Sequence, residues 1–125
     1  MKYILDKIIK GTFYAVRGAW YGFYSRRNLS LFLIITLLVV SLLILLGTTK
    51  VKFAIIFSCW VAAIIVEILN SAVEKFIDIY HPNFHEGLGK VKDMLAGAVF
   101  LTIVNAIIVT VILLWDPVME KIFGA

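Results

Sequence analysis

Long uncharged stretches separated by short charged segments dominate the pattern of this 125-residue chain. Residues 28–49 and 94–115 each form a run of 22 residues without a charge. A helix of this length rises about 33 Å, enough to cross a hydrocarbon core about 30 Å thick. A third apolar stretch, 53–69, contains Glu67 and can span a membrane if Glu67 lies near the interface. The pattern therefore predicts three membrane helices, within residues 29–49, 53–80 and 94–115.

The first 24 residues have a different pattern. Their charged residues share one face of a helical projection, and apolar residues that include Ile4, Leu5 and Ile8 occupy the other face. The segment lacks the uninterrupted apolar core of a cleavable signal peptide. We expect residues 1–24 to form an amphipathic helix that lies on the membrane surface.

Composition agrees with an all-α membrane protein that forms a single domain over residues 1–125. Hydrophobic residues make up 62% of the chain, and the mean hydropathy is +1.02. Lys and Arg concentrate before the first span and between the second and third spans, which predicts a cytoplasmic N-terminus and an outward C-terminus. Because the positive charges flank the spans, the net charge of +4 does not indicate nucleic-acid binding.

A polar stripe follows the second apolar run. At about 100° per residue its members fall within an arc of roughly 100° on a helix, and they are Glu67, Asn70, Ser71, Glu74 and Asp78. Carboxylates at the mouth of a membrane helix need a partner, and a cation such as Mg²⁺ shared with phosphates is a suitable one. A solvated face explains Glu74 and Asp78 taken alone. It does not explain Glu67, which interrupts the apolar run and suits a general base.

The segment that follows this stripe, residues 81–93, is the second candidate for chemistry. Pro82, Gly87 and Gly89 predict a turn or loop. Lys92 is a candidate phosphate ligand, although interfacial anchoring is an alternative explanation for it. Asp93 is expected to hold a cation or to cap the third span. Within that span, Asn105 is expected to face protein rather than lipid.

The residues of both segments resemble a known family. The run from Glu67 to Glu74, Glu-Ile-Leu-Asn-Ser-Ala-Val-Glu, is similar to the signature of prokaryotic diacylglycerol kinases. So is Lys92-Asp93 followed by Ala-Gly-Ala-Val, and the resemblance runs without gaps from about Lys7 to Trp115. Residues 85–93 resemble the Gram-negative diacylglycerol enzymes more than the Gram-positive undecaprenol kinases.

This resemblance implies a homotrimeric kinase of the bacterial cytoplasmic (inner) membrane. Each protomer would have a surface helix and three transmembrane helices, with active sites between neighbouring protomers on the cytoplasmic side. The enzyme would transfer the γ-phosphoryl group of ATP, with Mg²⁺ as cofactor, to the hydroxyl of diacylglycerol and form phosphatidic acid. Undecaprenol or another lipid alcohol is an alternative acceptor.

The resemblance also implies roles for individual residues. Glu67 would be the general base, and Glu74 would hold the magnesium ion. The lipid substrate would contact Glu67, Asn70, Ser71 and Trp115. The nucleotide would contact Lys7, Arg26, Glu74, Asp78, Glu86, Lys92 and Asp93.

Arg26 is a departure from the family pattern, which usually has a metal-binding glutamate at this position. The substitution implies weaker magnesium binding, since one carboxylate is missing. Two other interpretations stay open: Arg26 contacts a phosphate directly, or the chain is a weak or inactive relative that binds nucleotide or lipid.

Overall fold

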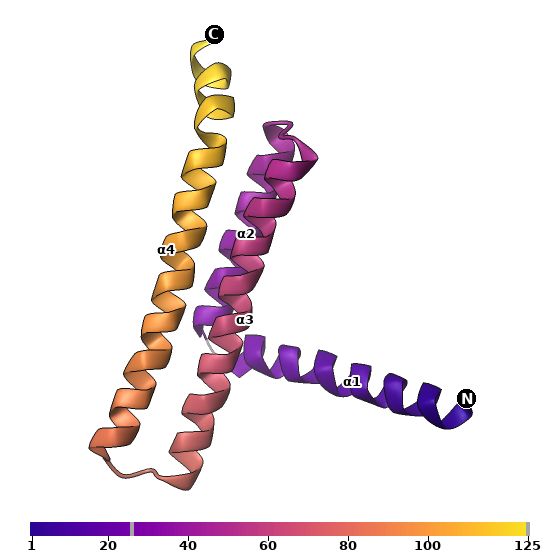
Figure 1. Ribbon diagram of the computed structural model, residues 1–125, viewed down its shortest axis with the longest axis vertical. Coiled ribbons are helices and arrows are strands. Elements are labelled where there is room, and N and C mark those ends of the chain that lie inside the picture. Colours follow the sequence, from indigo (N-terminus) through magenta and orange to yellow (C-terminus); the bar gives the residue numbers. More distant parts are fainter. Residues whose placement is uncertain (26, 125) are drawn as a thin grey trace.

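The chain folds into four helices in the computed structural model, which describes residues 1–25 and 27–124. The helices are α1 (Lys2–Ser25), α2 (Arg27–Leu45), α3 (Lys50–Tyr80) and α4 (Glu86–Phe123), as Figure 1 shows. None of the described residues lies in a strand, which confirms the predicted all-α fold class. Three of the helices, α2, α3 and α4, are long and apolar enough to cross a membrane.

Helix α3 packs against both α2 and α4, while α1 projects sideways from the bundle (Figure 1). Gly22 lies where α1 meets α2 and α3. A Cβ atom on Gly22 would lie 3.3 Å from Leu29 Cδ1 and 3.5 Å from Ile68 Cγ1, so the missing side chain allows this close approach. The apolar face of α1, with Ile4 and Ile8, is exposed and therefore open to a membrane surface.

A tight turn joins α2 to α3. Gly47 adopts a φ of 62°, the left-handed conformation that glycine tolerates without strain, and the chain thereby leaves α2. The hydroxyl of Thr49 then accepts a hydrogen bond from the Lys52 amide at 3.3 Å and caps α3. Helix α3 consequently begins at Lys50, three residues before the predicted start.

The connection between α3 and α4 is shorter than the sequence predicts. The turn or loop expected at Gly87 and Gly89 is wrong, because α4 already begins at Glu86 and includes both glycines. The N-cap of α4 is His85, whose Nδ1 accepts from the Leu88 amide at 3.2 Å, so Asp93 does not cap this helix. A Cβ atom on Gly87 would lie 3.1 Å from His85 Cε1, so this glycine makes room for the capping imidazole.

The apolar core lies in the half of the bundle away from α1. It consists of Leu43, Ile56, Trp60, Ala106 and Leu114, which come from α2, α3 and α4. Polar atoms within it are paired: Trp60 Nε1 donates to Thr110 Oγ1 at 3.0 Å, and Thr110 Oγ1 donates to the Ala106 carbonyl at 2.6 Å. This chain of hydrogen bonds ties α3 to α4 inside the hydrocarbon region.

Asn105, which is expected to face protein, lies on the outside of the single chain. The side chain is exposed in the single chain, and its Nδ2 atom lies 3.8 Å from Cys59 Sγ on α3. Sulfur is a weak acceptor, so this contact satisfies little of the hydrogen-bonding capacity of the amide.

Candidate active site

The first residues of the polar stripe on α3 are buried. Glu67 is 3% exposed, Asn70 is 7% exposed and Ser71 is 8% exposed. These three residues are therefore not part of a solvated helix face. Polar side chains at such depth are costly, and in membrane proteins they commonly mark sites of function.

A cleft of about 380 Å³ opens along this stripe and is lined by α2, α3 and α4. Its polar wall is formed by Glu67, Asn70 and Glu74, together with Asn28 of α2. The remaining wall is apolar and consists of Phe32, Ala96, Val99, Phe100 and Ile103. Carboxylates beside an apolar opening suit a molecule that has a polar head and a hydrocarbon chain.

Two buried polar atoms of the stripe have no hydrogen-bond partner, namely Asn70 Oδ1 and Ser71 Oγ. A buried polar atom left unpaired costs about 1–3 kcal/mol. Asn70 lines the cleft, so a ligand hydroxyl bound there can donate the missing hydrogen bond to Oδ1. Ser71 lies beside Asn70 on α3 but outside the cleft wall, and its contact with lipid stays a prediction.

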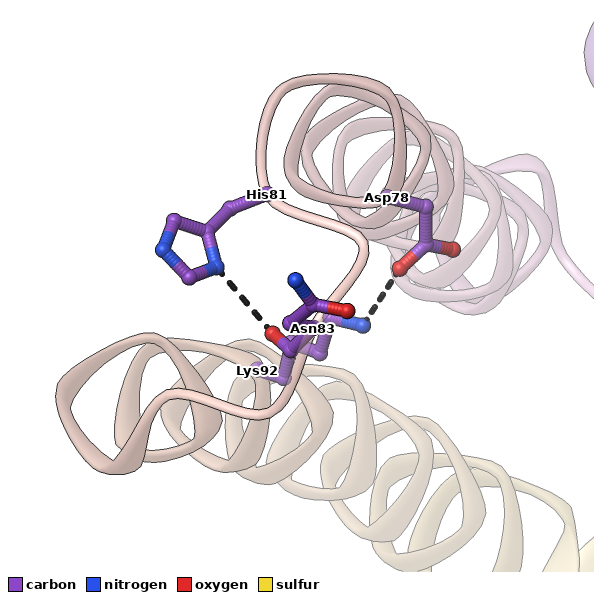
Figure 2. Close-up of polar contacts among 4 residues, drawn as sticks. All are labelled: Asp78, His81, Asn83 and Lys92. Carbon is purple, nitrogen blue, oxygen red and sulfur yellow. Dashed lines mark hydrogen bonds and ion pairs between the residues drawn. The ribbon is translucent and has the colours of Figure 1, made fainter.

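An ion pair joins α3 to α4 at the far end of the stripe. Lys92 Nζ lies 2.6 Å from Asp78 Oδ1, and Figure 2 shows Lys92 reaching across from α4 to Asp78. The two side chains are 37% and 59% exposed, so the pair adds at most about 1 kcal/mol to stability. Its clearer effect is to hold the Lys92 ammonium on the face of α3 that carries Glu74, about one helical turn beyond it.

The loop after α3 encloses a second cavity, of about 310 Å³, beside this ion pair. Its lining includes Asp78, Lys92 and the loop side chains His81, Asn83 and His85. His81 Nδ1 donates to the Asn83 carbonyl at 3.1 Å (Figure 2), and the His81 and His85 rings meet edge-on with centroids 5.2 Å apart. The imidazoles therefore organise the loop and form one wall of a cavity that reaches Lys92.

Magnesium requires carboxylate oxygens, and the stripe supplies them. Within residues 1–25 and 27–124 there is no group of three His, Cys, Asp or Glu side chains able to hold a metal. Magnesium that is bound to ATP needs only one or two carboxylates, because phosphates and water complete its shell. Glu74, half-buried in the cleft wall, meets this requirement. It lies two helical turns, or about 10 Å, beyond Glu67 along α3.

Two predicted nucleotide ligands on α4 lie outside the cleft. Glu86 and Asp93 are both exposed. Glu86 is in the first turn of α4 and pairs with Lys90 at 3.6 Å. Their roles in binding ATP stay predictions.

Other predicted site residues lie farther away in the single chain. Lys7 is on α1, beside a surface depression that it lines with Asp6 and Lys10. Trp115 follows Ile103, the last residue of α4 in the cleft wall, by twelve residues, which places it about 18 Å along the helix from the cleft. Arg26 lies outside the described residues. The structure thus groups Glu67, Asn70 and Glu74 on one cleft, but it does not group Lys7 or Trp115 with them.

Some residues of the site had no role in the sequence predictions. Asn28 adds an amide to the polar wall, and Val99, Phe100 and Ile103 form its apolar side. The three apolar residues recur at spacings of three and four, which indicates a shared helix face. That spacing does not reveal which face of α4 meets α3, so the cleft itself could not be read from it.

The chain is similar to known proteins over most of its length. Residues 13–114 match the family model described as prokaryotic diacylglycerol kinase. The diacylglycerol kinase of Escherichia coli (strain K12) is 33% identical over 113 residues, which cover 88% of this chain and 90% of that protein. The diacylglycerol kinase of Synechocystis sp. is 31% identical over 108 residues, covering 86% of this chain and 62% of the relative. That of Haemophilus influenzae is 27% identical over 99 residues, covering 79% and 84%.

The family match includes the whole polar stripe, the cleft and the Asp78–Lys92 ion pair. It also covers all three helices that are suited to cross a membrane over most of their lengths. The chain therefore belongs to the prokaryotic diacylglycerol kinase family.

Proposed function

We propose that this membrane protein is an ATP-dependent lipid kinase that phosphorylates diacylglycerol to phosphatidic acid. Its family and the names of its relatives support a diacylglycerol kinase-like lipid kinase. The observation that carries the proposal is the cleft itself, where a buried carboxylate, Glu67, lies beside an apolar wall. A neutral lipid with one free hydroxyl matches both surfaces.

Glu67 is proposed as the general base. Its carboxylate takes the proton of the lipid hydroxyl while the hydroxyl oxygen attacks the γ-phosphorus of ATP. The bond from the γ-phosphorus to the bridging oxygen breaks, and ADP leaves with the electron pair. The single hydroxyl of the glyceride is its only hydrogen-bond donor. On binding it donates to Asn70 Oδ1, which has no partner in the single chain and so orients the glyceride, and for the transfer step the same hydrogen turns to Glu67.

The nucleotide is proposed to lie toward the loop, beyond Glu74. Phosphoryl transfer depends mainly on positioning and on neutralising phosphate charge. Bound magnesium supplies part of that neutralisation, and Glu74 is the residue that would hold it. Lys92 supplies a second positive charge, and the cavity lined by Asn83 and His85 offers space for the nucleoside.

We also propose that the protein works as a homotrimer. The number of subunits follows from the family resemblance, and a face of α3 supports self-association. This face lies opposite the polar stripe, is exposed, and repeats at alternating spacings of four and three: Val51, Ile55, Ser58, Ala62, Ile65, Leu69, Ala72, Phe76 and Ile79. Such a repeat, with small residues that allow close approach, favours packing between parallel copies of a helix.

The proposed membrane is the bacterial cytoplasmic (inner) membrane. The N-terminus and the Glu67 cleft would face the cytoplasm, and the C-terminus would face outward. The distribution of Lys and Arg supports this orientation, and a cytoplasmic cleft has access to ATP.

A phosphoryl-transfer assay tests the function. Purified protein in mixed micelles receives labelled Mg-ATP with dioleoylglycerol or undecaprenol, separately and in competition. We expect labelling of dioleoylglycerol to be the faster reaction. Preferential labelling of undecaprenol would instead assign the alternative substrate. Binding of Mg-ATP without transfer to either lipid would indicate a non-catalytic relative.

The Glu67→Gln variant tests the mechanism in the same assay. Loss of a general base lowers transfer by roughly 10²- to 10⁴-fold. Asp116→Asn is the control, because Asp116 is an exposed carboxylate at the other end of the bundle and lines no part of the cleft. Equal rates for wild type and Glu67→Gln would remove Glu67 from this role.

A further inference from the structure

A cavity of about 470 Å³ lies at the end of the bundle opposite the Glu67 cleft. It is formed by the turn between α2 and α3, the start of α3 and the end of α4. Its lining residues are Leu46, Gly47, Thr48, Thr49, Lys52, Pro117, Glu120 and Lys121. None of them lines the Glu67 cleft, and the part contributed by α4 lies beyond the family match, which ends at residue 114.

Three charged side chains from two helices border this cavity: Lys52 of α3, and Glu120 and Lys121 of α4. Within the part of the chain that the structure describes, none of the three forms an ion pair. The Thr49 hydroxyl oxygen accepts from the Lys52 amide, so its hydrogen can be donated to another group. The cavity therefore presents two ammonium groups, a hydroxyl donor and one carboxylate to a ligand.

The position of the cavity along the helices indicates where it lies in a membrane. Helix α2 ends at Leu45, directly before the lining residue Leu46. The apolar run of α4 ends at Trp115, which is exposed and is followed by Asp116. Exposed tryptophan at the end of a span is typical of the boundary between hydrocarbon and headgroups. The cavity therefore lies at headgroup level, where phospholipids surround the protein.

We propose that this cavity binds the headgroup of a phospholipid that carries a phosphodiester and a primary ammonium group, as phosphatidylethanolamine does. The phosphate lies between Lys52 and Lys121, and the ammonium group lies against Glu120. A headgroup with only negative charge would leave Glu120 facing an anion, whereas the zwitterionic headgroup matches all three side chains. A diacylglycerol lacks the phosphate, so this site differs in ligand chemistry from the cleft.

Native mass spectrometry of the full-length protein, released from micelles that contain one added lipid, tests the site. The lipids are dioleoyl phosphatidylethanolamine, dioleoyl phosphatidylglycerol and dioleoylglycerol. We expect wild type to retain phosphatidylethanolamine best. Because each lysine near a lipid surface contributes about 1 kcal/mol, Lys52→Gln with Lys121→Gln lowers retention about 30-fold.

Lys50→Gln is the matched control, since Lys50 begins the same helix but does not line the cavity, and it should retain lipid as wild type does. Glu120→Gln gives a second test that does not depend on the double variant folding: it should shift preference from phosphatidylethanolamine toward phosphatidylglycerol. Circular dichroism checks the helical content of each variant.

Three results would overturn the proposal. The first is equal phosphatidylethanolamine retention by wild type and a folded double variant. The second is retention of dioleoylglycerol as strong as that of phosphatidylethanolamine. The third is displacement of bound lipid by millimolar inorganic phosphate, which would assign the cavity to a free anion. None of these measurements depends on kinase activity, so they test the lipid site separately from the proposed function.

Discussion

The α3–α4 pair has two halves, one around Trp60 and one around Asn70, and they differ in whether their polar atoms have hydrogen-bond partners. Around Trp60, each polar side chain has a partner: the indole donates to Thr110, and Thr110 donates to the Ala106 carbonyl. Around Asn70, less than three turns further along α3, two buried polar atoms have none. Trp60 and Asn70 are equally buried, and both halves belong to the same two helices.

The difference indicates that the Trp60 half stabilises the bundle and the Asn70 half binds a ligand. A paired polar chain within hydrocarbon holds helices together, because breaking it leaves unpaired groups in an apolar medium. Unpaired buried atoms lower stability, and a ligand that supplies the missing partner recovers that free energy. Substitutions in the Trp60 half should therefore affect stability, whereas substitutions in the Asn70 half should affect activity.

After Glu67, the largest effect in this comparison is expected at Glu74. Glu74→Gln keeps the shape of the side chain but removes the charge that would hold magnesium. Loss of a carboxylate from such a site should raise the magnesium concentration needed for half-maximal transfer by roughly 10- to 100-fold. Titration of magnesium at fixed ATP measures this value.

Chelation supplies the control for that titration. Excess EDTA should abolish transfer by wild type, and added magnesium should restore it. An unchanged magnesium requirement in Glu74→Gln would contradict the assignment of the metal to this end of the cleft.

Asn70→Leu is expected to have a smaller effect, raising stability while lowering activity. Removing the buried, unpaired Oδ1 atom should raise the free energy of unfolding by about 1 kcal/mol. Losing one hydrogen bond to the lipid should lower transfer about tenfold. Denaturation in mixed micelles and the transfer assay measure the two quantities. A fall in stability would show that Asn70 is paired in the assembled protein and has a structural role, as Trp60 does.

Much of the fold and part of this site could be predicted from the sequence. The uncharged runs predict the membrane helices because a span must exclude charge over its whole length. The arc from Glu67 to Asp78 predicts one face of α3 because helical spacing alone determines it. Three residues of that arc are buried as a group, and Asp78 is instead exposed and pairs with Lys92.

The remaining features depend on contacts between helices. Gly87 and Gly89 usually break helices, yet the His85 cap on the Leu88 amide allows α4 to begin before them. The apolar wall of Val99, Phe100 and Ile103 resembles any other apolar face of a membrane helix. Its place in the cleft follows only from how α4 packs on α3.

Thr110→Val tests the other side of the comparison. The change leaves Trp60 Nε1 without its acceptor while keeping the volume of the side chain. Hydrogen bonds between membrane helices contribute about 0.6 kcal/mol on average and up to about 1.7 kcal/mol, and the free energy of unfolding should fall by that amount. Thr110→Ser retains the hydroxyl and is the control. Transfer activity per folded molecule should stay unchanged. A specific loss of activity would show that the Trp60 half also contributes to catalysis.

Asn105→Leu should have the smallest effect, and it extends the comparison to the outside of the bundle. Asn105 lies near the middle of the apolar run of α4, is exposed in the single chain, and has only the weak contact with Cys59 Sγ in the part of the chain described. A polar amide at this depth requires a partner, and another copy of the chain can supply it. Replacement by leucine should weaken association by about 0.6 kcal/mol, or roughly threefold. Sedimentation equilibrium in density-matched detergent measures this change. Stronger association of the leucine variant would show that Asn105 faces lipid. An unpaired polar side chain would then indicate a binding site only inside the cleft.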